Sequence, residues 1–193
     1  MKNQYFFALI LFAFAYGFSA EVETKDYMFS EGYLALEGGE AYPWGIIEDA
    51  VQPSLYGQGE FYYRYWENTY GLVQFGYAYF RTQDYFKRFP GVHQFHGRVG
   101  LDHQFSWMRP ILLGVGFSCI WARSDGGDPE DKGPGVMLTD NESEFGSFIK
   151  AKLPILKYEK YAVGLNIYWE HIWTLPEKSN MLWIGLFVQR RMW

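Results

Sequence analysis

The stretch HQFHGRVGLDHQFSW, residues 93–107, alternates apolar and polar side chains with a period of two. One parity holds Phe95, Val99, Leu101, Phe105 and Trp107, and the other holds Gln94, His96, Arg98, Asp102, Gln104 and Ser106. In a β-strand the two parities face opposite sides of the sheet. The stretch is too long for an ordinary soluble strand, but its length suits a strand that tilts across a bilayer.

The same alternation recurs along the chain and predicts strands near residues 28–38, 54–66, 70–81, 93–107, 110–123, 143–155, 161–173 and 181–193. The links at 39–53, 82–92, 124–142 and 174–180 are long, and they alternate with short links at 67–69, 108–110 and 156–160. Bacterial transmembrane barrels have short periplasmic turns and longer outside loops. The sequence therefore predicts an all-β fold, an eight-stranded antiparallel up-and-down transmembrane β-barrel whose first strand rises from the periplasm.

Aromatic residues gather near the ends of these strands, and the chain stops on one of them, Trp193. Such rings favour the membrane–water interface. In these features residues 28–193 resemble the small eight-stranded outer-membrane barrels, the OmpA/OmpX-like family. In that family the last strand commonly ends in an aromatic residue that the barrel-assembly machinery recognises. The resemblance implies that Trp193 is an assembly signal and that this machinery is a partner.

The last strand departs from the family pattern. Leu182, Ile184, Leu186 and Val188 face lipid by parity, whereas Trp193 shares the other parity with residues 189 and 191. A β-bulge near residues 189–191 would turn Trp193 outward. Without a bulge, the assembly signal is weak.

The N-terminus has the layout of a secretory signal peptide. Lys2 precedes an apolar run at residues 5–16, and small residues follow at 17–20. The run is too short for a stable spanning helix, which makes an uncleaved anchor the weaker alternative. We expect a signal peptide at 1–20, a barrel domain at 21–193, and a location in the outer membrane of a diderm (Gram-negative) bacterium.

The composition narrows the function classes. Aromatic residues make up 21% of the chain, yet its mean hydropathy is −0.21, which suits a sheet with one apolar and one wet face. The net charge of −5 makes nucleic acid an unsuitable partner. Cys119 is the one cysteine, so an internal disulfide and a multi-cysteine metal site are excluded. We expect no cofactor and no metal.

Charged residues share the inward parity and predict a polar network in the lumen, formed by Glu60, Arg64, His96, Arg98, Asp102, Glu144, Lys150, Lys152 and Glu170. Eight strands leave an interior just wide enough for side chains. Buried charges must be paired and hydrogen-bonded. We therefore expect pairs between strands that plug the barrel. The alternative is a narrow, porin-like ion path that opens when pairs exchange.

Two dipeptides, Asp102-His103 and Glu170-His171, resemble catalytic dyads. Neighbours in a strand point to opposite faces, so neither pair can act together. We predict no catalysis. Two alternatives stay open: a lipid A-modifying outer-membrane enzyme, and a soluble lipocalin-like barrel with its apolar face inside.

The longest link, residues 124–142, is rich in acidic residues and glycine. Its spacing matches no EF-hand, although divalent cations could bridge it to lipopolysaccharide phosphates. The expected partners are outer-membrane lipids and lipopolysaccharide, together with a loop partner that the sequence does not identify. The predicted role is structural or adhesive: a membrane anchor that presents its loops.

Overall fold

The computed structural model describes residues 30–83, 91–124, 141–173 and 179–193. The predicted signal peptide at 1–20 and most of the acidic link at 124–142 lie outside these residues. The strands are β1 (Gly32–Gly45), β2 (Ser54–Trp66), β3 (Thr69–Arg81), β4 (Gly91–His103), β5 (Leu112–Ser124), β6 (Asn141–Lys157), β7 (Tyr161–Ile172) and β8 (Ser179–Arg191). A short helix, α2 (Ile46–Ala50), follows β1, and a 3-10 turn, η2 (Ser106–Met108), follows β4. None of the described helices is both long and apolar enough to cross a membrane.

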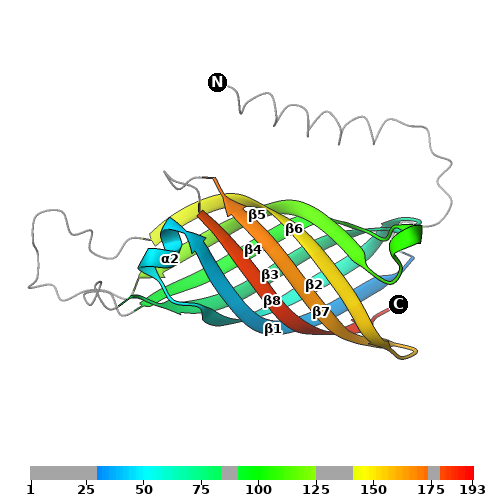
Figure 1. Cartoon of the computed structure of the whole chain (residues 1–193). Coiled ribbons are helices and arrows are strands. Elements are labelled where there is room, and N and C mark those ends of the chain that lie inside the picture. Colours follow the sequence, from blue (N-terminus) through cyan, green and yellow to red (C-terminus); the bar gives the residue numbers. More distant parts are fainter. Residues whose placement is uncertain (1–29, 84–90, 125–140, 174–178) are drawn as a thin grey trace, which may run out of the picture.

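The strands form one closed barrel in sequence order (Figure 1). Each strand pairs antiparallel with the next, and β8 pairs with β1 from Tyr33↔Arg191 to Gly45↔Ser179. Closure removes both sheet edges, so every strand has two partners for its backbone. The predicted eight-stranded antiparallel barrel is confirmed.

Each strand presents large apolar side chains on the outside of the barrel. One exposed example per strand is Leu36, Leu55, Phe75, Val99, Val115, Ile149, Leu165 and Leu186, with exposed fractions from 38% to 73%. The charged residues of the same strands, such as Arg98 and Lys150, are buried inside. A soluble lipocalin-like barrel would place its apolar face inside. The observed orientation excludes that alternative.

The first strand differs most from its prediction. The alternation predicts a strand at 28–38 and a loop from 39, but β1 continues to Gly45. The reason is its partner: β8 supplies a ladder along the whole of residues 33–45, whereas β2 pairs only as far as Ala41. Glycines weaken a strand's own preference. Pairing on both sides overrides that weakness as far as Ala41, and pairing with β8 alone carries the strand on to Gly45.

The fourth strand is shorter than its alternation suggests. β4 ends at His103, opposite Thr69, where β3 begins. Residues beyond 103 have no partner strand, and the chain turns through η2, in which Met108 N–H donates to the Phe105 carbonyl. Phe105 and Trp107 remain exposed on the outside, so the apolar parity continues past the strand as part of an aromatic rim.

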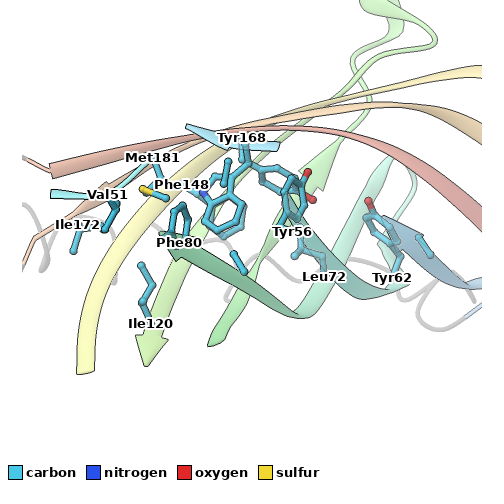
Figure 2. Packing of buried hydrophobic residues seen from close by; sticks show 14 residues of the cluster. Val51, Tyr56, Tyr62, Leu72, Phe80, Ile120, Phe148, Tyr168, Ile172 and Met181 are labelled. Carbon is cyan, nitrogen blue, oxygen red and sulfur yellow. The ribbon is translucent and has the colours of Figure 1, made fainter. Parts of the chain in front are cut away.

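The end of the barrel that carries α2 is closed by apolar side chains. We call this group the apolar cap; it consists of Val51, Phe80, Ile120, Ile172 and Met181, all less than 9% exposed (Figure 2). The backbone following α2 is bonded to the end of β3, the neighbour of β2: Val51 forms a bridge with Thr82, and Gln52 N–H donates to the Arg81 carbonyl at 2.8 Å. The opposite end holds the short turns and the C-terminus (Figure 1).

Candidate functional site

The interior of the barrel holds the candidate site. Seven of the nine predicted luminal residues are at most 3% exposed: Glu60, His96, Arg98, Asp102, Lys150, Lys152 and Glu170. Arg64 and Glu144 lie toward opposite ends of the barrel and are partly exposed. Arg64 pairs there with Glu31 at 2.9 Å. The structure thus brings seven of the predicted residues into the lumen and leaves two near its ends.

Two lysines and two acids form the first ion cluster, in the half of the lumen nearer the short turns. The Lys150 ammonium pairs with Glu60 and, at 2.8 Å, with Asp102. Lys152 lies 3.3 Å from the other oxygen of Glu60. Both lysines also donate to the hydroxyl of Tyr62, Lys150 at 2.7 Å, and both ammoniums lie over its ring. Glu60 therefore pairs with both lysines, and the Tyr62 ring packs against both ammonium groups.

Arg98 and Glu170 form the second cluster, across the middle of the lumen. The guanidinium donates to both carboxylate oxygens, Nη2 at 2.7 Å and Nε at 3.3 Å. Trp183 Nε1–H donates to the same carboxylate at 2.9 Å. Arg98 Nη1 donates to Gln58 Oε1 at 2.9 Å, and the same oxygen lies 2.9 Å from His96 Nε2. Both charges are desolvated, and a bidentate, hydrogen-bonded geometry offsets that cost.

A further buried acid, Glu37, is absent from the predicted network. Its carboxylate accepts hydrogen bonds from the Tyr56 hydroxyl, from Asn166 Nδ2 at 2.7 Å and from the Tyr168 hydroxyl at 3.3 Å. No cation lies within ion-pair distance of it in the described part of the chain. Glu37 shares the inward parity with Ala35, so the alternation could have identified it despite the glycines around it.

Neutral polar side chains were also missed, although they share the inward parity. Gln58, Gln74 and Asn166 are at most 5% exposed and connect the charged groups. Gln74 Nε2, for example, donates to the Tyr168 hydroxyl at 2.7 Å. The lumen is therefore a continuous polar network that contains four acids, one arginine and two lysines among the described residues.

Glycines on neighbouring strands make room for inward-facing side chains. Gly114 pairs with Asp102 in the β4–β5 ladder, and a Cβ at Gly114 would collide with the Asp102 carboxylate. Gly116 lies under the ring of Phe148, which a Cβ would also displace. Close packing inside a narrow barrel requires such small–large pairs.

The two sequence neighbours that resemble dyads are separated by the sheet. Asp102 and Glu170 are fully buried in the lumen, whereas His103 and His171 lie on the outer face. There His103 contacts Thr69 at 2.9 Å, and His171 contacts Asn180 at 2.9 Å. These pairs cannot share a proton, because each strand places its neighbours on opposite faces.

Trp193 reaches the outer face without the bulge predicted near residues 189–191. The ladders of β8 run unshifted through residues 189–191, so the bulge suggested by the parity is absent. The strand ends at Arg191, but the backbone beyond it stays bonded to Gly32: Met192 N–H donates to the Gly32 carbonyl at 2.8 Å, and Gly32 N–H donates to the Trp193 carbonyl at 3.4 Å. The Trp193 ring lies beside Phe61, with ring centroids 6.0 Å apart. The ring is 53% exposed and covers Gly32. Gly32 thus lies opposite two residues, Met192 and Trp193, and this two-to-one pairing turns the aromatic residue outward.

No protein-family model matches the sequence, and no curated protein matches it. Solved structures match in fold. The outer membrane protein AlkL, determined in lipid bilayers, has a TM-score of 0.58 at 10% identity over 90% of this chain and 95% of that chain. Ail, the attachment invasion locus protein of Yersinia pestis, has a TM-score of 0.55 at 8% identity over 84% and 98% of the two chains.

A third neighbour, Neisserial surface protein A, has a TM-score of 0.53 at 10% identity over 82% of this chain and 96% of its own. Identities this low show a common fold and nothing finer. The closed meander of eight strands, the apolar exterior and these neighbours agree. The chain therefore has the fold of the small eight-stranded outer-membrane barrels, as its resemblance to the OmpA/OmpX-like proteins predicts.

Proposed function

We propose that this chain is an outer-membrane protein whose barrel is a closed, non-catalytic anchor for the loops at its α2 end. The role is structural or adhesive. The observation that carries the proposal is the closed lumen. The apolar cap blocks one end, and paired charges fill the middle, so a water-filled path has no room.

The energetics of the ion pairs support closure. Arg98 and Glu170 are both fully desolvated, and separating them would leave each charge buried without its partner. Such a separation costs several kcal/mol. A conducting state needs that separation as well as displacement of the apolar cap. The narrow ion path is therefore the weaker of the two functions.

The α2 end of the barrel has features that suit the presentation of loops. The α2 end bears the longer links. There Trp44 is 56% exposed and packs edge to face with Trp169, and the first turn of α2 carries the acidic residues Glu48 and Asp49. Exposed aromatic and acidic groups of this kind can contact lipid head groups or a partner. Two neighbours of this fold are named a surface protein and an attachment protein, which is consistent with a surface role.

Conductance tests the closed lumen. The purified protein in planar bilayers is expected to show no current steps above the lipid baseline. Steps in the wild type that change when Arg98→Gln or Glu170→Gln is introduced would replace the anchor with a narrow channel.

Accessibility tests the orientation. In a Cys119→Ser background, Asp49→Cys places a thiol on α2, and Glu159→Cys places one on the turn between β6 and β7. A membrane-impermeant maleimide is expected to label Asp49→Cys in intact cells and Glu159→Cys only after the outer membrane is opened. The reverse order of labelling would refute the proposed presentation of α2 at the cell surface.

A further inference from the structure

A cavity of about 230 Å³ opens at the turn end of the barrel. Its walls come from strand ends all around the barrel, including Tyr33 of β1, Tyr70 of β3 and Arg191 of β8. The end of β6 adds Lys157, and the turn between β6 and β7 adds Lys160. We call this cavity the vestibule. It is smaller than a typical pocket for a drug-sized ligand and suits a single small molecule.

The vestibule is closed below. Its floor is Tyr62, which is 2% exposed and whose hydroxyl accepts hydrogen bonds from Lys150 and Lys152. Beyond that floor come the ion clusters and then the apolar cap. A ligand can therefore enter only from the turn end, which is the periplasmic end in the proposed orientation.

The vestibule wall is positively charged. Lys157, Lys160 and Arg191 face Glu159, the single acid in the wall. No ion pair joins Lys157 or Lys160 to a carboxylate in the described part of the chain. Arg191 shares Glu31 with a second guanidinium, that of Arg64, at 3.4 and 2.9 Å. The wall thus holds three basic side chains and one acid, so it attracts an anion.

Tyrosines give the wall its second property. Tyr33 and Tyr70 pack edge to face with ring centroids 6.2 Å apart, and Tyr62 lies on the floor. Each ring offers an apolar face. The Tyr33 hydroxyl donates to Glu31 at 2.7 Å and can still accept, and the Tyr70 hydroxyl accepts from Arg64 at 3.4 Å and can still donate. Together with the lysines, they match a small molecule that carries both an anionic group and hydroxyl groups.

We propose that the vestibule binds a small phosphorylated polyol or sugar, or the chemically equivalent head group of an anionic phospholipid. Lys157 and Lys160 contact the phosphate, and the tyrosines contact the hydroxyl-bearing part. This site is separate from the anchoring role, because it uses neither the loops nor the ion clusters for its specificity.

Isothermal titration of the full protein in phosphatidylcholine nanodiscs tests the site, with glucose 6-phosphate as the probe. We expect saturable binding that weakens by about tenfold in the Lys157→Gln/Lys160→Gln double variant, since two charge-assisted hydrogen bonds are lost. The matched control is Arg81→Gln/Arg123→Gln. It removes two exposed positive charges at the α2 end and is expected to leave the affinity within about twofold of the wild-type value.

Absence of saturable binding, or an equal loss in both double variants, would overturn the proposal, because the charge effect would then be non-specific. Nanodiscs that contain phosphatidylglycerol distinguish the two sources of the ligand. A lower apparent affinity there assigns the vestibule to a lipid head group, and an unchanged affinity assigns it to a soluble molecule. Nanodiscs are open on both faces, so the result does not depend on the proposed orientation.

Discussion

Replacing Glu170 with glutamine tests whether the lumen is dry. The Glu170 carboxylate is fully buried and accepts three hydrogen bonds, two from Arg98 and one from Trp183. Glutamine keeps the shape but removes the counter-charge, and its amide N–H₂ faces donors. Loss of one partner from a buried ion pair costs about 3–5 kcal/mol.

The expected cost of Glu170→Gln lies at the lower end of that range, about 3 kcal/mol. The reason is that Arg98 keeps other favourable contacts. Gln58 still accepts from Arg98 Nη1 at 2.9 Å, and the guanidinium lies 4.6 Å from the ring centroid of Trp183. The measurement is the free energy of unfolding by urea in phosphatidylcholine vesicles, followed by tryptophan fluorescence.

Glu31→Gln is the matched control. It removes a carboxylate that pairs with Arg64 at 2.9 Å and with Arg191 at 3.4 Å, but both of these pairs are partly open to solvent. Its expected cost is about 1 kcal/mol or less, and salt should reduce it further. Similar losses for the two variants, or a loss below about 1 kcal/mol for Glu170→Gln, would refute the reasoning, because water would then be solvating the Arg98 charge.

Three further substitutions test other parts of the barrel. Phe75→Arg places a charge at the centre of β3, where the Phe75 ring is 65% exposed on the lipid-facing side, and should lower the free energy of unfolding by about 2–4 kcal/mol in the same vesicle assay. Phe75→Leu, which stays apolar, should lower it by less than about 1.5 kcal/mol. Gly114→Ala should displace the Asp102 carboxylate and lower the free energy of unfolding by about 1–3 kcal/mol. Gly57→Ala should be close to neutral, because a Cβ there would have its nearest neighbouring atom 4.0 Å away on the outer face, and equal effects of the two variants would contradict the packing argument. Trp193→Ala should reduce the heat-modifiable, folded band on gels of outer-membrane fractions. Trp107→Ala should not, although Trp107 is also exposed, at 78%, at the same end of the barrel; equal amounts of folded protein in both variants would show that Trp193 is not an assembly signal.

The alternation of the sequence was sufficient to predict the fold, because a period of two assigns each side chain to one face of a strand. Arg98 and Lys150 inside, with Phe75 and Val99 outside, follow from parity alone. The ends of the strands do not follow from it. β1 extends to Gly45 because β8 pairs with it, and no local signal in a glycine-rich segment reveals that partner.

The sequence also did not reveal which charged residues pair with one another inside the lumen. Arg98 is 72 residues from Glu170, and Lys150 is 90 residues from Glu60. Which pairs meet across the axis depends on the stagger of the closed barrel, because stagger decides which residues of distant strands reach the same height. Parity places residues on a face, but it does not give their height along the axis.

Closure and stability of this barrel have the same physical origin. One arginine, two lysines and four acids can stay desolvated only while each is held by partners. Glu37, which lacks a cation, is held by neutral donors from Tyr56, Asn166 and Tyr168. If parting Arg98 from Glu170 costs about 3 kcal/mol, the separated state is populated below about 1% at equilibrium, since every 1.4 kcal/mol is a factor of ten. A path through the lumen would also need the apolar cap to move, which lowers that population further. The interactions that stabilise the folded barrel therefore keep it shut, and the positions left for a ligand are its two ends.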